Sequence, residues 1–511
     1  MNNNITRRDF LKFAGLLPLT AAAYRSASWL NPLQGEEKAQ NVLVMVFDAF
    51  SASNISIYGY PRETMPNLAR LADRAIVYHK HHSGGNFTTP GSASLLTGTL
   101  PWTHRAFHHR EKVVESFVDK NLFAAFGNYY RIAYSHNPLL DVYFDQFSEY
   151  LDEWIPRNRL FVTKDVLIPT LFADDEDIAT VSWVRAIKDK EEGFAYSLFA
   201  AHLYEKLQEK KVATLEPQFP RGIPYIAGDN YFLLEDAVNW LQENLEAFPQ
   251  PFVGYFHFLP PHAPYNTHID FVDYFKNDGY TPPQKPVDPV FKDGNFRPDF
   301  AEKKRTNYDE YILYVDREFG RLFDSLENSG LLENTWLVLT SDHGEMQERG
   351  IIGHKTEVLY EPVVHIPLLI FEPGRKTRLD VHTPTSAADV LPTLLHLTGQ
   401  GPADWSEGIV LPPFSDSNLA ERRSIYVVEA KKSKKYAPLT TATLAMIKEG
   451  YKLMYFFGYE ELGPSGERIE LYDLESDPEE MNDLYSSKGE TASEMLHELK
   501  TKLGEVDSPY K

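Results

Sequence analysis

The chain contains several largely apolar runs, and two of them end directly on acidic residues. Residues 41–47 and 336–340 are short and rich in β-branched and aromatic side chains, which predicts two buried central strands. The first run is followed by Asp48, and the second by Ser341, Asp342 and His343. Because ligands gather at the carboxyl ends of parallel strands, these side chains are candidates for a binding site. A polar turn that caps each strand is the alternative interpretation.

Other segments have the apolar spacing of helices that pack on a sheet. Residues 252–259 form a third strand-like run, which ends at Pro260, Pro261 and His262. Four segments place apolar side chains three or four positions apart, as on one helix face: residues 66–73, 231–245, 312–326 and 384–399. Shorter β-like runs at 425–428 and 452–457 predict a small antiparallel subdomain. The pattern therefore favours a large α/β domain followed by a smaller β-rich one.

The segment 88–98 combines a helix start with hydroxyl side chains. Thr89 can cap a helix that begins at Pro90 and ends at Gly98, which would leave Thr88 just outside the N-terminus. The free N–H groups at such a terminus favour an anion. A hydroxyl there, next to a divalent metal, can attack phosphorus or sulfur. An ordinary Thr-Pro helix start accounts for the same residues without any chemistry.

Composition limits the classes of function. The net charge of −22 argues against a nucleic-acid backbone as the main partner, whereas a small anionic substrate stays compatible if a metal supplies positive charge locally. The 511 residues include no cysteine, so disulfides, thiolate ligands and a cysteine nucleophile are excluded. Neither the Gly-x-Ser-x-Gly motif of serine hydrolases nor a P-loop motif is present.

Residues 1–34 resemble a twin-arginine export signal followed by a linker. Arg7 and Arg8 precede a modest apolar stretch at 13–23, which ends in three alanines. This stretch is interrupted by Pro18 and is too short to cross a bilayer comfortably. We therefore expect a periplasmic or secreted protein with no membrane span in the mature chain. An uncleaved signal would instead act as a membrane anchor.

A set of motifs, taken in order, resembles the sulfatase branch of the alkaline phosphatase superfamily. The motifs are Asp48 with residues 58–61, then 65–72, 88–98, 308–322, 341–345, 359–369 and 471–478. The resemblance implies an alkaline-phosphatase-like fold, with a mixed, mostly parallel sheet between helices. It implies a sulfatase-like catalytic domain at 38–415 with a substrate-shaping insertion at 150–230. A small antiparallel subdomain is expected at 420–490.

The resemblance also implies a metal-dependent site. Asp48, Thr88, Asp342 and His343 would bind one divalent ion, and three oxygens with one nitrogen suit Ca²⁺, Mn²⁺, Mg²⁺ or Zn²⁺. Two histidine clusters, on residues 79–82 and 104–109, could hold a second metal, although such clusters on loops are more often solvated. The sequence therefore predicts one metal centre, with a second as the alternative.

Three further residues fall where the family contacts the substrate anion. His262 follows a predicted strand, and the resemblance implies that it touches the anion or protonates the leaving oxygen. His354 and Lys355 fall where family members carry His or Lys near the anion. A rigid Pro-His-Ala-Pro loop and a solvated loop are the respective alternatives.

The chain departs from the family at the position of the nucleophile. Sulfate-ester hydrolases of the family oxidise a Cys or Ser to formylglycine in a Cys/Ser-x-Pro-x-Arg context, whereas this chain has Thr88-Thr-Pro-Gly-Ser92. Formylglycine should not form here. Relatives with threonine, such as phosphoethanolamine transferases and lipoteichoic acid synthases, use it unmodified on phosphodiesters but carry membrane-spanning domains. Ala49 also replaces a second Asp that is common in sulfatases.

These features predict an exported, metal-dependent hydrolase that cleaves sulfate or phosphate esters through a covalent intermediate. The threonine favours phosphomonoesters or phosphodiesters. One alternative is a phosphoethanolamine- or glycerophosphate-type transferase that acts on envelope glycans or lipids. Another alternative is a binding protein that keeps the fold without turnover. In each case the expected partner is an anionic ester, and nucleic acid is not expected.

Overall fold

The central sheet of the computed structural model contains eight strands among the residues that the structure describes, which are 39–162, 196–226, 230–415 and 417–511. From one edge to the other, these strands are β11 (Leu379–Val381), β2 (Ile76–Tyr78), β10 (Leu368–Phe371), β7 (Thr335–Thr340), β1 (Asn41–Phe47), β6 (Phe252–Phe258), β4 (Tyr130–Ser135) and β5 (Glu153–Trp154). Only β10 runs antiparallel to its neighbours within this sheet. The predicted mixed, mostly parallel sheet is confirmed.

The three central strands end in register. Phe47 at the end of β1 pairs with Phe258 of β6, while Val46 pairs with Thr340 of β7. Both predicted strands, 41–47 and 336–340, are therefore present and fully buried. Because the strands are parallel, the residues that follow them meet at one edge of the sheet.

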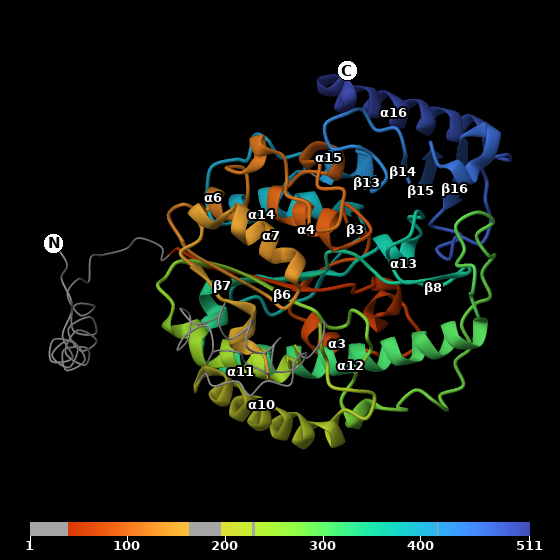
Figure 1. Ribbon diagram of the computed structural model, residues 1–511. Helices are drawn as coiled ribbons and strands as arrows, with labels where there is room; N and C mark the ends of the chain where they lie inside the picture. The colour runs from red at the N-terminus through yellow and green to blue at the C-terminus, as the bar shows by residue number, and fades with distance from the viewer. Residues whose placement is uncertain (1–38, 163–195, 227–229, 416) are drawn as a thin grey trace. The chain divides into compact units, whose positions relative to one another are not determined.

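Helices cover both faces of the sheet (Figure 1). On one face lie α4 (Thr88–Thr97), α6 (Leu122–Ala125), α7 (Pro138–Gln146) and α14 (Val390–Leu397). On the other lie α3 (Pro66–Ala72), α11 (Leu234–Asn244) and α12 (Pro298–Asn328). Each face of the sheet buries its own apolar cluster against its helices. This arrangement satisfies the hydrophobic faces of the sheet and leaves the strand ends open to a site.

The apolar spacing located the helices better than it located their ends. The predicted segments 66–73 and 231–245 correspond to α3 and α11. The segment 312–326 is the buried part of α12, which begins earlier, at Pro298. Its first turns carry mostly exposed side chains, so no apolar stripe marks them. The segment 384–399 contains a short strand before α14 begins at Val390.

The C-terminal part forms a separate antiparallel sheet, which confirms the prediction. Its order is β13 (Ile425–Glu429), β14 (Ala442–Lys448), β15 (Tyr451–Phe457) and β16 (Glu467–Asp473). Helix α16 (Gly489–Asp507) packs on this sheet and buries Ala492, Met495 and Leu499 against it. Residues 40–511 together form one compact unit.

The remaining strands and α-helices complete the fold. They are β3 (His81–His82), β8 (Gln347–Glu348), β9 (Ile351–Ile352), β12 (Thr385–Ser386), α5 (Pro101–His104), α10 (Tyr196–Leu215), α13 (Glu361–Val364) and α15 (Ser417–Arg422). The predicted insertion at 150–230 begins with β5 at the sheet edge and includes α10, while residues 163–195 and 227–229 lie outside the described residues. The predicted export signal at 1–34 also lies outside them. In the described part of the chain, no helix is both long and apolar enough to cross a membrane.

Candidate active site

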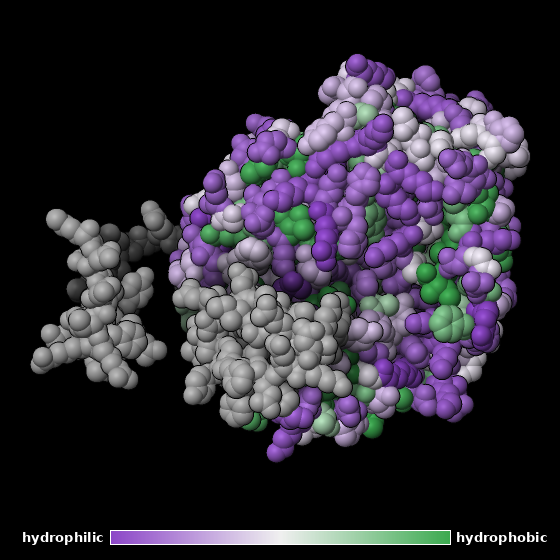
Figure 2. Space-filling view, in the orientation of Figure 1, coloured by the Kyte–Doolittle hydropathy of each residue, from purple (hydrophilic) through white to green (hydrophobic). Residues whose placement is uncertain are grey.

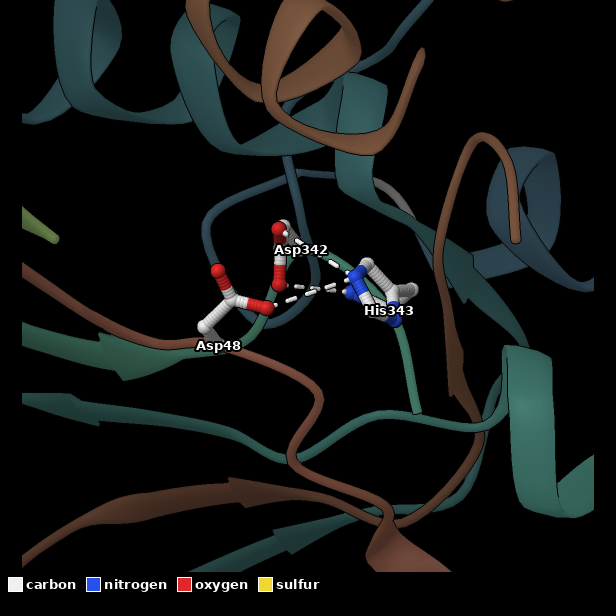
Figure 3. A group of neighbouring side chains, drawn as sticks. All are labelled: Asp48, Asp342 and His343. Carbon is white, nitrogen blue, oxygen red and sulfur yellow. Dashed lines mark hydrogen bonds and ion pairs between the residues drawn. The ribbon is translucent and has the colours of Figure 1, made fainter. Parts of the chain in front are cut away.

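Three polar side chains converge where β1 and β7 end (Figure 3). Asp48 follows β1 directly, and Asp342 and His343 follow β7 after one serine. One ligand atom from each of the three lies within 4.8 Å of the others, and all three side chains are fully buried. His343 Nε2 is 3.4 Å from Asp48 Oδ1 and 3.6 Å from Asp342 Oδ2. The structure therefore brings together the three predicted ligands from distant parts of the chain.

Hydrogen bonds fix one atom each of Asp48 and His343 and leave Asp48 Oδ1 and His343 Nε2 facing each other. Asp48 Oδ2 accepts from Asn137 Nδ2 at 2.6 Å and lies 3.1 Å from His257 Nε2, while the buried Oδ1 has no hydrogen-bond partner among the described residues. His343 Nδ1 lies 2.8 Å from the Gly344 carbonyl, which holds the tautomer with a lone pair on Nε2. A divalent cation is the group that such a free carboxylate oxygen and imidazole nitrogen fit.

The charges of the site are compatible with a bound cation. Burial opposes ionisation of Asp48, but His262, His257 and His343 outweigh it and hold the pKa of this carboxyl well below its usual range. Burial, and then the charge of Asp48, raises the pKa of Asp342. Burial works against a charged His343, yet Asp342 and Asp48 raise its pKa to about 9. Without a metal, a protonated imidazole thus partly compensates the two carboxylates.

Thr88 lies beside this group, although not where the sequence predicted it. Helix α4 begins at Thr88 itself, and the extended Phe87 occupies the N-cap position with no side-chain cap. The prediction that Thr89 caps the helix is wrong, while Gly98 does end it in the left-handed conformation. Thr88 Oγ1 is 3.3 Å from His343 Nε2 and 3.4 Å from Asn137 Nδ2. The hydroxyl therefore lies at the edge of the Asp48, Asp342 and His343 group.

The close packing of α4 on the residues after β7 depends on Gly91. A Cβ atom on Gly91 would lie 2.1 Å from the carbonyl oxygen of Asp342, and 2.9 Å from its carbonyl carbon. Because these are backbone atoms, neither can move without displacing the segment that carries Asp342 and His343. The helix that carries Thr88 can approach Asp342 only because position 91 has no side chain.

Replacing Gly91 with alanine is therefore expected to lower activity by about 100-fold, because relieving the clash separates Thr88 from Asp342 by about 1 Å. It should also destabilise the fold by about 2 kcal/mol. Gly127→Ala is the matched control, since the nearest atom to its added Cβ is an ordinary 3.6 Å away. Steady-state kinetics and denaturant unfolding of both variants measure these effects. Equal activity in the two variants would contradict the packing argument.

The C-terminal subdomain supports the segment after β7 through α13. The carbonyls of Pro362 and Val363 accept hydrogen bonds from Glu345 and Gly344, at 2.9 and 2.7 Å. The same helix begins at Glu361, whose Oε1 is 2.8 Å from the fully buried Lys452 Nζ on β15. A buried ion pair with a fixed geometry thus connects the second sheet to the segment that carries His343.

The three residues predicted to contact substrate lie around one cavity of about 280 Å³. His262, His354 and Lys355 all line it. The ring of His354 lies between those of His343 and His262, with centroids 4.3 and 5.0 Å away. His354 is buried and Lys355 is exposed, so the solvated-loop alternative holds for the lysine only.

Sequence reasoning missed three polar residues of the site. His257 and Asn137 both donate toward Asp48, and Glu345 Oε2 is 3.3 Å from His354 Nδ1. Asn137 follows β4 by two residues, so the strand-end argument used for Asp48 could have found it. His257 lies inside a buried strand, and only its register with β1 reveals that it faces Asp48.

Neither histidine cluster forms a group of three metal-ligating residues within the described ranges. The expectation that these clusters lie on solvated loops is wrong for His81, His82 and His104, because these three side chains are buried. His104 Nδ1 accepts from the Ala106 N–H at 3.1 Å, and its Nε2 is 3.2 Å from Ser94 Oγ on α4. Both nitrogens of His104 are therefore used, one by the backbone after α5 and the other by α4.

His104 gives the fold a dependence on pH. Burial lowers its pKa to about 3, whereas a histidine in the unfolded chain titrates near 6.5. As the pH falls from about 6.5 to about 3, the unfolded state binds a proton that the native state does not. The contribution of His104 to stability should therefore decrease by about 1.4 kcal/mol per pH unit in this window. The unfolding free energy of His104→Gln, measured at several pH values, should therefore fall less steeply with decreasing pH than that of the unchanged chain. Equal slopes in the two proteins would contradict this role of His104.

The chain matches two family models and several known proteins. Residues 40–400 match the family model described as sulfatase, and residues 352–508 match the model described as the C-terminal part of N-sulphoglucosamine sulphohydrolase. The choline-sulfatase of Rhizobium meliloti (strain 1021) is 24% identical over 440 residues, which cover 82% of this chain and 77% of the relative.

Solved structures show the same fold. The phosphonate monoester hydrolase of Agrobacterium radiobacter superposes with a TM-score of 0.62 at 20% identity, over 91% of this chain and 96% of that protein. A sulfated-sugar complex, solved with D-glucosamine-2-N,6-O-disulfate as its substrate, superposes with a TM-score of 0.62 at 16% identity, over 93% and 100% of the two chains. The match to the sulfatase model covers well over half of the sequence. The chain is an ester hydrolase that belongs to the sulfatase family.

Proposed function

We propose that the protein is an exported, metal-dependent hydrolase that cleaves sulfate or phosphate esters with Thr88 as its nucleophile. The observation that carries this proposal is the position of the Thr88 hydroxyl, 3.3 Å from His343 Nε2, at the edge of the Asp48, Asp342 and His343 group. A turn that only caps a strand does not need three buried ligand atoms and a buried hydroxyl close together.

Asp48 Oδ1, an oxygen of Asp342 and His343 Nε2 would hold one divalent cation, with Thr88 Oγ1 as a further ligand. Ca²⁺, Mn²⁺, Mg²⁺ and Zn²⁺ all accept this donor set. When bound, such an ion lowers the pKa of an adjacent hydroxyl and offsets negative charge on the ester oxygens. Asn137 and His257 fix the other oxygen of Asp48, which keeps Oδ1 turned toward the site.

Thr88 Oγ1 would attack the phosphorus or sulfur atom of the ester in line with the leaving oxygen. The new bond joins Oγ1 to that atom, the ester bond to the alcohol breaks, and the hydroxyl proton of Thr88 is lost to solvent. Water then cleaves the Thr88 ester, which releases phosphate or sulfate and restores the hydroxyl. The N-terminus of α4, where Thr88 lies, favours the negative charge of the bound group.

The cavity residues would orient the anion and the leaving group. His262 and His354 lie on the cavity side of His343, where a leaving oxygen would receive a proton from an imidazole. Glu345 Oε2 lies 3.3 Å from His354 Nδ1, which would leave the buried Nε2, unpartnered among the described residues, to act on the substrate. Lys355 adds an exposed cation at the cavity mouth.

An unmodified threonine favours phosphorus over sulfur as the centre that is attacked. It also makes transfer a second candidate, because the Thr88 ester can pass its group to an alcohol instead of water. In that case the protein would be a phosphoethanolamine- or glycerophosphate-type transferase on an envelope glycan or lipid. An inactive binding protein would hold the metal and form no Thr88 ester.

The location of the protein is proposed from the sequence alone. Arg7 and Arg8 with the apolar stretch after them favour twin-arginine export, so we propose a periplasmic or secreted protein. Export by this route carries folded proteins, which suits a site loaded with metal before export. Fractionation of cells that express Arg7→Lys/Arg8→Lys beside the unchanged chain would test the signal.

One assay series tests the proposed chemistry. Purified protein is incubated with an aryl sulfate, a phosphate monoester, a phosphodiester and a phosphonate monoester, each with Ca²⁺, Mn²⁺, Mg²⁺ or Zn²⁺ after chelation. We expect turnover to require an added metal and to be faster on a phosphorus ester than on the sulfate. An added alcohol that appears in the product would establish transfer. Turnover that is indifferent to chelation would contradict the proposal.

A further inference from the structure

A buried asparagine lies two residues before the proposed nucleophile. Asn86 is fully buried and precedes Thr88, the first residue of α4. Figure 2 shows mainly hydrophilic residues on the face around α4 and β13, where water can satisfy polar groups. The amide of Asn86 has no access to this water, so its hydrogen bonds must come from the protein.

The amide nitrogen of Asn86 finds both of its partners in the turn that lines the catalytic cavity. Nδ2 donates to the carbonyl of His354 at 3.1 Å and to that of Thr356 at 2.6 Å. These carbonyls lie on either side of Lys355, and all three residues of the turn line the cavity. One buried side chain thus holds the backbone on both sides of Lys355.

The backbone before α4 directs Asn86 and Thr88 to the same side of the chain. Phe87, which lies between them, is extended, with φ −153° and ψ 172°. Side chains alternate in direction along an extended segment, so those two residues apart point the same way. The hydroxyl of Thr88 lies 3.3 Å from His343 Nε2, while the amide of Asn86 reaches the turn. The nucleophile and the turn are therefore connected through one short extended segment.

Two further hydrogen bonds hold the turn, and neither joins it to the segment that carries the nucleophile. The Gly353 N–H donates to the Met346 carbonyl at 2.7 Å, which ties the turn to the segment after β7. Lys431 Nζ, from the C-terminal subdomain, donates to the Lys355 carbonyl at 3.1 Å. Asn86 adds the connection between the turn and the nucleophile segment, and it does so with two hydrogen bonds.

His354 is the side chain of the turn whose place bears most directly on the reaction. Its ring lies between those of His343 and His262, with centroids 4.3 and 5.0 Å away. Because Asn86 holds the carbonyl of the same residue, loss of that bond would let the ring move. A displacement of about 1 Å at a reacting group can lower a rate by about 100-fold. Asn86 should therefore affect the reaction through the turn.

We propose that Asn86 is a positioning residue for the cleavage of the ester. It fixes the turn of residues 353–357 relative to Thr88, so that His354 meets the leaving oxygen while the nucleophile meets phosphorus or sulfur. In that step the bond from Thr88 Oγ1 forms and the bond to the leaving oxygen breaks. The leaving oxygen takes a proton from an imidazole of the cavity, which solvent restores. This inference rests on the proposed ester hydrolysis, and the closing experiment separates the two.

The test compares three variants with the unchanged chain on two esters. Asn86→Ala removes both hydrogen bonds, and Asn86→Ser keeps one hydroxyl donor nearer the backbone. Asn121→Ala is the control, because Asn121 is also fully buried and its Nδ2 donates to the Val118 carbonyl at 2.8 Å, but it does not line the cavity. The esters share the acid group that the unchanged chain turns over fastest, and their leaving alcohols are phenol and nitrophenol. Amide hydrogen exchange of residues 353–358 is measured on the metal-loaded proteins without substrate.

In Asn86→Ala, we expect kcat/KM to fall about 100-fold on the phenyl ester and less than about tenfold on the nitrophenyl ester, because a more basic leaving oxygen depends more on a well-placed proton donor. Asn86→Ser should shift the ratio of the two values in the same direction by a smaller factor. The amides of the turn should exchange faster in both Asn86 variants. Asn121→Ala should keep the ratio and the exchange rates of the unchanged chain, even where its unfolding temperature falls.

An unchanged ratio in Asn86→Ala, or the same shift of the ratio in Asn121→Ala, would overturn the inference. If Asn86→Ala does not fold, the ratio measured for Asn86→Ser decides in the same way. A lack of turnover of either ester by the unchanged chain would instead contradict the proposed function, and the exchange rates would still show whether Asn86 fixes the turn. The two failures are therefore distinguishable.

Discussion

Replacing Thr88 with alanine should reduce turnover of every ester substrate by about 10⁴-fold or more, because the reaction loses its nucleophile. Metal binding should weaken much less, since the two carboxylates and the imidazole remain in place. Steady-state assays on the phosphorus and sulfate esters, with metal content measured on the same samples, give both numbers. Rapidly quenched wild-type protein should also carry the substrate-derived group on the peptide that contains Thr88.

The neighbouring Thr89→Ala provides a matched control for this prediction. Thr89 is buried in the same helix turn, and its hydroxyl has no hydrogen-bond partner among the described residues. Its carbonyl keeps the bond from Tyr143 in the variant, since only the side chain changes. We expect near-normal activity from Thr89→Ala. If Thr88→Ala were as active as this control, Thr88 would not be the nucleophile.

Replacing Asp342 with asparagine should abolish tight metal binding, so that the stability of the fold no longer depends on the metal concentration. In the unchanged chain, metal that binds only the folded state should stabilise it, by about 4 kcal/mol at a thousand times the Kd. In the variant, this dependence should disappear. The metal-free variant should also be more stable than the metal-free wild type, because Asp342 is a buried carboxyl whose pKa burial and Asp48 raise. Thermal unfolding with and without chelator measures each effect.

Asp316→Asn is the control for a buried carboxyl that is not near the metal. Asp316 on α12 accepts two hydrogen bonds from Asn67 at Oδ2 and one from the Leu68 N–H at Oδ1, and the amide nitrogen of an asparagine could not accept the pair at Oδ2. This variant should be destabilised while its unfolding temperature still rises with metal. The assigned ligands would be contradicted if the unfolding temperature of the wild type did not change with metal. They would also be contradicted if that of Asp342→Asn still rose with metal.

The residues at the strand ends could be predicted because a local sequence pattern identifies them. A continuous apolar run that stops at Asp48 or Asp342 identifies both the buried strand and the polar group at its end. The parallel register then brings these ends together without further assumptions. The helices on the sheet were visible for the same reason, since their apolar spacing reports the face that they bury.

The remaining parts of the site depend on contacts between distant segments. His257 looks like one more residue of a buried strand until its register places it beside Asp48. The start of α4 could not be found because the Thr-Pro pair offers a cap at Thr89 that the chain does not use. The role of Glu345 depends on the turn that brings His354 back toward it. Local patterns carry no information about such pairings.

Diffraction from crystals grown with Mn²⁺, recorded at the manganese absorption edge, would locate the cation itself. We predict one strong anomalous peak within about 2.3 Å of Asp48 Oδ1, an Asp342 oxygen and His343 Nε2, with Thr88 Oγ1 next to it. A peak at other residues, or no peak at this group in metal-saturated active protein, would contradict the site and the role of Thr88 with it.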